Sequence, residues 1–116
     1  MNVEQRTLGG VTILDLEGRM TIESLERPVR ATVRRLLSEG RKHFLLNMDG
    51  VPYVDSTGLA EIMEAYLTTT RQGGMVKLEH LSRRAHEMLK VTGLLTVLEV
   101  FDSETAPLAG FAPPSP

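Results

Sequence analysis

The chain of 116 residues contains no cysteine and no tryptophan. The absence of cysteine excludes disulfide bonds, thiolate metal ligands and cysteine nucleophiles. Aromatic residues make up only 4% of the chain, so we expect no base-stacking platform for nucleic acid. Basic and acidic residues nearly balance, with a formal net charge of −2. This balance predicts no general attraction to nucleic acid or to an anionic membrane.

The sequence also lacks an apolar run long enough to cross a bilayer, because the most apolar stretch, 91–101, is short and interrupted by polar residues. The first residues lack the basic-then-apolar order of a signal peptide. We therefore expect a cytoplasmic protein without membrane insertion. The length fits one domain, 1–110, with a core of Leu, Val, Ile and Met. The Pro-rich end, 111–116, is predicted to be a disordered tail.

Hydrophobic periodicity predicts alternating strands and helices after an initial hairpin. The expected strands are 7–8, 11–17, 43–48, 75–80 and 97–101; the expected helices are 25–38, a helix from Leu59 to Gly73-Gly74, a helix from Ser82 to Gly93, and a short final helix capped by Asp102 or Ser103. The order ββαβαβαβα defines an α/β fold. It implies a mixed sheet of four to five strands whose later members are parallel, with helices mainly on one face.

Individual residues mark where several of these elements begin. Val11, Ile13 and Leu16 are expected to point inward from the second strand. Pro28 fits only the first turn of a helix, where a missing N–H costs little, so it locates the start of the first helix. Ser82 is expected to cap the third helix.

The segment Asp55-Ser56-Thr57-Gly58 places small polar residues where a loop becomes a helix. A helix N-terminus presents unpaired N–H groups and a partial positive charge, so Ser56 or Thr57 could carry a phosphoryl group there. Gly58 is expected to remove a side chain that would crowd that group. Asp55 could cap the helix, orient the hydroxyl or repel an added phosphate. A plain N-cap explains the same residues equally well.

Three stretches carry a resemblance to a known family: Tyr53-Val54-Asp55-Ser56-Thr57-Gly58-Leu59, then Gln72-Gly73-Gly74 with Lys77-Leu78-Glu79-His80-Leu81, then Leu89-Lys90-Val91-Thr92-Gly93-Leu94. Together they resemble the stand-alone STAS-domain anti-sigma factor antagonists of bacteria, over about residues 11–108. The resemblance implies that Ser56, or less readily Thr57, is phosphorylated by a GHKL-type serine kinase that is also the anti-sigma factor. The unphosphorylated form would bind that kinase and release a sigma factor, and a PP2C-type phosphatase would reset the cycle.

The resemblance also implies a partner-binding surface and no enzymatic activity. This surface comprises Thr21 and the run Asp55, Ser56, Thr57, Gly58 and Leu59. Many family members carry an acidic residue shortly after the glycine that ends the second strand, whereas this chain has Gly18-Arg19-Met20-Thr21. We expect a monomer or weak dimer without a cofactor or a bound metal. His43, His80 and His86 lie on separate elements without the spacing of metal ligands.

Three alternatives stay open at this point. A non-switching STAS subunit or scaffold, such as part of a lipid-transport assembly, would use the region around Ser56 as a constitutive docking surface. Half of a dimeric aspartic protease would need an Asp-Thr-Gly triplet in a β-rich chain, but Ser56 interrupts that triplet and a helix follows. An enzyme that forms an aspartyl phosphate on Asp55 would need a partner acid and a basic residue that the sequence does not reveal.

Overall fold

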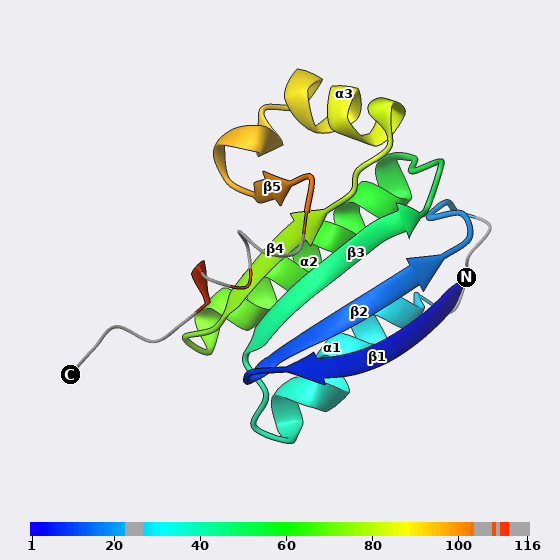
Figure 1. Ribbon diagram of the computed structural model, residues 1–116. Coiled ribbons are helices and arrows are strands. Elements are labelled where there is room, and N and C mark those ends of the chain that lie inside the picture. Colours follow the sequence, from blue (N-terminus) through cyan, green and yellow to red (C-terminus); the bar gives the residue numbers. More distant parts are fainter. Residues whose placement is uncertain (23–26, 104–107, 109, 112–116) are drawn as a thin grey trace.

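The computed structural model describes residues 1–22, 27–103, 108, 110 and 111. Its elements are β1 (Asn2–Leu8), β2 (Val11–Glu17), α1 (Pro28–Ser38), β3 (His43–Gly50), α2 (Ser56–Arg71), β4 (Met75–Glu79), α3 (Arg83–Val91), the 3₁₀ helix η1 (Leu94–Thr96) and β5 (Glu99–Phe101) (Figure 1). The predicted α/β class and alternation are confirmed. The predicted final helix falls largely on 104–107 and 109, outside the described residues.

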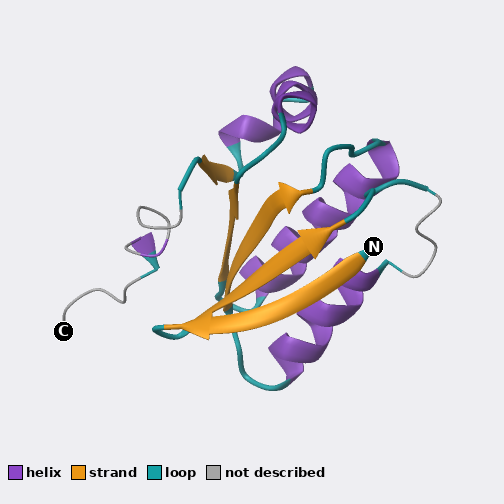
Figure 2. Cartoon of the chain, turned by 45° about the vertical axis from the view of Figure 1, so that its right-hand side comes forward, coloured by secondary structure: helices purple, strands orange, loops and turns teal. Residues whose placement is uncertain are grey.

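The strands form one five-stranded sheet in the order β1-β2-β3-β4-β5. β1 pairs antiparallel with β2, while the other neighbours pair in parallel, as a chain of strand–helix–strand crossovers requires. Helices α1 and α2 lie side by side against the same face of the sheet, which Figure 2 shows in an oblique view. The mixed sheet with helices mainly on one face is therefore confirmed.

The main core fills the space between the sheet and the two helices. Alternate residues of β2 and β3 point into it because successive strand side chains face opposite ways. The strand contributions are Leu14, Leu16, Phe44, Leu46, Met48, Val76 and Leu78, and the helices contribute Val29, Val33, Leu36, Leu59, Ile62 and Ala65. Pro28 occupies the first position of α1, as the sequence predicts.

A smaller apolar cluster lies on the opposite face of the sheet. Val11 and Ile13 are buried as expected, but they point away from Leu16 and pack with Leu45 and Phe111. Phe111, which the sequence analysis placed in the predicted tail, is only 3% exposed and belongs to this cluster. The rest of that tail, 112–116, lies outside the described residues.

The first and last strands begin at residues other than those predicted. β1 extends back to Asn2, because it pairs with β2 along its whole length although its side chains are mostly exposed and polar. β5 begins only at Glu99, because the chain first forms the turn η1 and leaves Val97 43% exposed. Periodicity is weak in both segments, since an edge strand has little apolar surface to bury.

Candidate functional site

Asp55 is the N-cap of α2 and joins that helix to a second segment. One carboxylate oxygen accepts a hydrogen bond of 2.9 Å from the backbone N–H of Gly58, which satisfies a free donor of the first helical turn. The other oxygen accepts a 2.9 Å bond from the backbone N–H of Ile22. These bonds, that of Gly58 first, hold the pKa of Asp55 below its usual range. Asp55 therefore stays ionised at neutral pH and fixes two chain segments at once.

Backbone contacts strengthen the same junction. Met20 donates its N–H to the carbonyl of Tyr53 at 3.1 Å, and the N–H of Asp55 donates to the carbonyl of Met20 at 3.0 Å. Met20 also forms an isolated parallel bridge with Val54. The segment after β2 is thus attached by main-chain hydrogen bonds to the loop that leads into α2.

Gly58 serves this junction in a way that the sequence does not indicate. A Cβ atom at this position would overlap the carbonyl oxygen of Met20 and lie 2.7 Å from its carbonyl carbon. The structure thus gives a reason for this glycine other than the expected room for a phosphoryl group, which stays a prediction. Glycine is required because the backbone of Met20 packs directly on the first turn of α2.

Ser56 is the first residue of α2 and is exposed. Its hydroxyl is therefore at the electropositive end of a helix of 16 residues, on an accessible surface. Thr57, the alternative acceptor, is half-buried. The geometry leaves Ser56 as the more accessible of the two hydroxyls.

The remaining residues of the predicted partner surface lie deeper. Gly58 is buried, and Leu59 is 8% exposed as a member of the main core. These two residues support the site from inside and offer almost no contact surface. Thr21 is 9% exposed and lines a neighbouring pocket.

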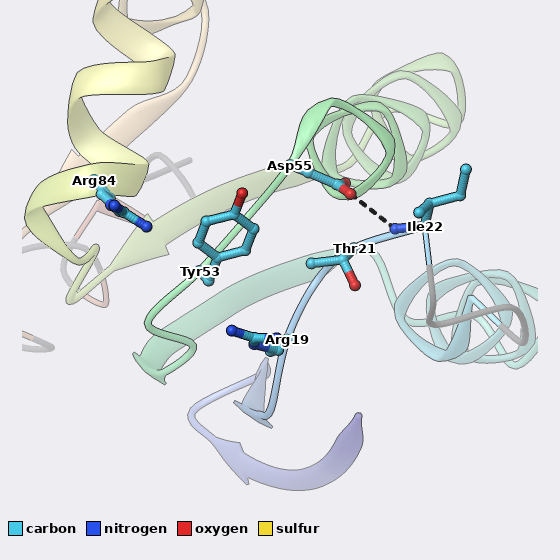
Figure 3. A pocket seen from close by; sticks show the side chains of 6 residues that line it. All are labelled: Arg19, Thr21, Ile22, Tyr53, Asp55 and Arg84. Carbon is cyan, nitrogen blue, oxygen red and sulfur yellow. Dashed lines mark hydrogen bonds between the residues drawn. The ribbon is translucent and has the colours of Figure 1, made fainter.

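That pocket has a volume of about 370 Å³ and is lined by Arg19, Thr21, Ile22, Tyr53, Asp55 and Arg84 (Figure 3). The guanidinium carbons of Arg19 and Arg84 lie 5.5 Å and 5.4 Å from the centroid of the Tyr53 ring, within the range of cation–π attraction. We call this feature the Tyr53 pocket. Asp55 belongs to its lining, and Ser56 follows directly along the chain.

The topology explains why these residues meet. Arg19 follows β2, Tyr53 follows β3, and Arg84 lies in the first turn of α3 after β4. The carboxyl ends of parallel strands share one edge of a sheet, and ligand sites in open α/β sheets form beyond that edge. Four residues of the pocket were not predicted as site residues: Arg19, Ile22, Tyr53 and Arg84. Their positions after successive parallel strands were the signal that could have found them.

Other kinds of site find little support in the part of the chain that the structure describes. Within residues 1–22 and 27–103, no three His, Asp or Glu side chains are grouped so that they could hold a metal ion. No described helix is both long and apolar enough to span a bilayer. Asp55 is the N-cap of a helix, and the fold combines helices with one mixed sheet. Neither feature matches the β-rich chain that the aspartic-protease alternative needs.

The fold and the site define a small α/β domain with an accessible serine beside a basic pocket. Residues 2–106 match the STAS domain, and the chain belongs to this family. It is 23% identical over 107 residues to an anti-sigma F factor antagonist of Paenibacillus polymyxa, covering 90% of this chain and 89% of that protein. It is 33% identical over 64 residues to the anti-sigma-B factor antagonist of Bacillus subtilis, covering 55% and 59%.

Solved structures share the same fold. An anti-sigma factor antagonist from Mycobacterium paratuberculosis aligns with a TM-score of 0.83 at 11% identity, covering 95% of this chain and 92% of that one. The phosphorylated form of SpoIIAA, a cell fate determinant of Bacillus, aligns with a TM-score of 0.72 at 14% identity, covering 94% and 97%. These likenesses establish the fold of the chain.

Proposed function

We propose that this chain is a cytoplasmic anti-sigma factor antagonist that acts by binding and not by catalysis. In this proposal it sequesters an anti-sigma factor through the surface around Ser56, as a monomer or weak dimer, and thereby releases a sigma factor. The observation that carries the proposal is the exposed hydroxyl of Ser56 at the capped N-terminus of α2. The functions of the two antagonist relatives support it.

We further propose that Ser56 is a phosphorylation switch. The anti-sigma factor would be a GHKL-type kinase that phosphorylates Ser56, and a PP2C-type phosphatase would remove the phosphate. Phosphorylation adds about −1.5 to −2 charges. At this position they would accompany the fixed negative charge of Asp55, while the helix N-terminus accommodates them within the fold. A repulsion and desolvation cost of about 3–4 kcal/mol in the complex would weaken binding by roughly two to three orders of magnitude.

Phosphorylation is tested by mixing the purified chain with ATP and the GHKL kinase encoded nearest to its gene. We expect one added phosphate on Ser56 by mass spectrometry, none on Ser56→Ala, and a normal yield on Thr57→Val. The phosphate should survive acid and hydroxylamine, which would cleave an acyl phosphate on Asp55. An unmodified chain that binds constitutively would instead favour the non-switching scaffold.

Binding is tested by calorimetry with the same kinase. Ser56→Asp should lose measurable binding, whereas Ser56→Ala should bind as the unmodified protein does and resist regulation. Both variants should keep the free energy of unfolding within about 1 kcal/mol, because an exposed side chain changes. Tight binding by Ser56→Asp would contradict exclusion by charge.

A further inference from the structure

The Tyr53 pocket contains two cations without an acidic partner among the residues that the structure describes. Arg19 and Arg84 both contact the ring of Tyr53, and neither forms an ion pair with any residue in the described part of the chain. Elsewhere Arg6, Arg30 and Arg35 each pair with a carboxylate. What distinguishes the two pocket arginines from the other described arginines is that both lie against the same aromatic ring.

Contact with an aromatic ring suits a guanidinium that receives an anion. The flat face of the group interacts with the ring, while its N–H donors lie in the guanidinium plane and remain free for hydrogen bonds. A carboxylate accepts such donors in pairs. The contact with Tyr53 thus leaves the N–H donors of Arg19 and Arg84 available to a ligand.

Asp55 determines which anion suits the pocket. Its carboxylate lines the same pocket, but both oxygens already accept backbone N–H groups, from Gly58 and Ile22. Two guanidinium groups and one carboxylate leave a single positive charge. A singly charged carboxylate balances that charge, whereas a doubly charged phosphate would meet repulsion from Asp55.

The rim offers a second kind of contact. Ile22 is 66% exposed although it lies in the pocket lining and its backbone is bonded to Asp55. An exposed aliphatic side chain beside a charged pocket is the arrangement found in protein interfaces, where an apolar contact surrounds or adjoins a specific charge pair. A protein ligand fits both features, whereas a free carboxylic acid uses only one.

We propose that the Tyr53 pocket receives an aspartate or glutamate side chain of the protein partner, held by Arg19 and Arg84, with Ile22 packed on the neighbouring partner surface. This inference rests on the proposed function and names the chemistry of the partner at the same site. It also gives the switch a direct target, because a phosphate on Ser56 would add negative charge beside the position that the incoming carboxylate must occupy.

The first experiment reverses charges and measures affinity for the anti-sigma factor kinase. Arg84→Glu and Arg19→Glu should each weaken binding at least tenfold, and Arg84→Lys should cause a smaller loss because it retains charge without the paired donors. Arg83→Glu is the matched control: Arg83 precedes Arg84, is exposed and lies outside the pocket lining, so its affinity should change less than threefold. Replacing the contacting acid of the kinase by lysine should restore binding to Arg84→Glu. Equal losses for Arg83→Glu and Arg84→Glu would overturn the proposal.

The second experiment needs no partner. The side-chain N–H signals of the arginines are followed by NMR while N-acetylglutamate or inorganic phosphate is added at millimolar concentration. N-acetylglutamate should shift the signals of Arg19 and Arg84 more than that of Arg83, and phosphate should shift them less. Uniform shifts, or a stronger response to phosphate, would contradict the carboxylate site.

The two experiments also separate this inference from the proposed function. If Ser56→Asp loses binding and the arginine variants do not, the pocket proposal fails while the antagonist function stands. If the kinase does not bind the unmodified chain, the antagonist function fails, and the response to N-acetylglutamate alone decides whether the pocket recognises carboxylates.

Discussion

The ends of the parallel strands form two edges of the sheet, one where the strands begin and one where they end, and these two edges are built differently. At the edge where the parallel strands begin, the connections are short turns with glycines at positive φ, such as Gly10 at 85°, Gly40 at 89° and Gly73 at 80°. At the edge where these strands end, the connections are joined to one another by hydrogen bonds of Met20 and Asp55 and carry the arginines of the Tyr53 pocket. The first edge reverses the chain, and the second holds a surface in a defined shape.

Gly73 and Gly58 illustrate two different reasons why a position requires glycine. At the first edge a side chain at Gly73 would meet nothing within 4 Å, so only the backbone angle requires glycine. At the second edge Gly58 is required by close contact with the backbone of Met20. Gly73 therefore serves conformation and Gly58 serves packing, and substitutions at these two positions should distinguish the two roles.

The largest effect is expected from Gly58→Ala. Its methyl group must displace the backbone of Met20, so we expect a loss of about 3 kcal/mol in the free energy of unfolding, measured by urea denaturation. Binding to the anti-sigma factor kinase should also be lost, because the segment that carries Arg19 and Ile22 would move. Gly73→Ala is the control and should cost about 1 kcal/mol, from its positive φ alone. Equal losses of unfolding free energy in the two variants would mean that the backbone of Met20 can move away from residue 58 at no cost.

A smaller loss is expected from Asp55→Ala, which removes both the cap of α2 and the bond to Ile22. We expect the free energy of unfolding to fall by about 2 kcal/mol. Ser82→Ala removes only the bond to Ala85 that caps α3 and should cost about 1 kcal/mol. Asp55→Asn should lie closer to the unmodified protein, since its amide oxygen can still cap α2. If Asp55→Ala cost no more than Ser82→Ala, the link to Ile22 would contribute nothing.

At the opposite edge a change should have the opposite sign. Thr69 is fully buried near the end of α2, and its hydroxyl has no hydrogen-bond partner in the described part of the structure. Thr69→Val keeps the shape and removes the unpaired polar group, so stability should stay equal or rise by about 1 kcal/mol. Thermal unfolding measures this effect, with Thr70→Val as the exposed control. A clear loss would reveal a bonding role for the Thr69 hydroxyl.

The smallest effect is a dependence on pH. The pKa of Asp55 in the folded protein is lowered by the N–H groups of Gly58 and Ile22. The contribution of Asp55 to folding stability is therefore complete above the ordinary pKa of 3.8 and is lost as the pH falls through the lower pKa of the folded state. The difference in unfolding free energy between the unmodified protein and Asp55→Asn should therefore be constant from neutral pH to about 5 and shrink in more acidic solution. If this difference in unfolding free energy grew on acidification, the pKa of Asp55 would be raised by folding and not lowered.

Asp15 provides a comparison away from the site. Its pKa is lowered first by the hydrogen bond from Arg6, at 2.7 Å. In urea titrations, the difference in unfolding free energy between the unmodified protein and Asp15→Asn should thus also shrink in acidic solution. Partner binding should not change. A change in partner affinity would place the outer face of the sheet in the interface as well.

The sequence predicts those parts of the fold that local chemistry dictates. Pro28 marks the start of α1 because its ring fits a first helical turn, and Ser82 caps α3 as expected. The structure also places Ser56 at the exposed start of α2, where the motif suggests it. In each case, the deciding interaction lies within a few residues along the chain.

Features that depend on distant residues could not be predicted in this way. The contact between Gly58 and Met20, and the meeting of Arg19, Tyr53 and Arg84, join segments that are separated by tens of residues. β1 is a strand because β2 pairs with it, and its own pattern of apolar residues is too sparse to reveal this. Alternation indicates that a side chain is buried, but the topology decides on which face.

Phe111 has a practical consequence for anyone who shortens or fuses this chain. Together with Leu108, it packs over Val11, Ile13 and Leu45 on the face of the sheet opposite the main core. A protein ending at residue 110 would lose the largest side chain of this cluster and expose part of its aliphatic surface to water, which favours self-association. Affinity tags and reporter domains should therefore be attached after this phenylalanine, so that any oligomer observed in solution reflects the native molecule.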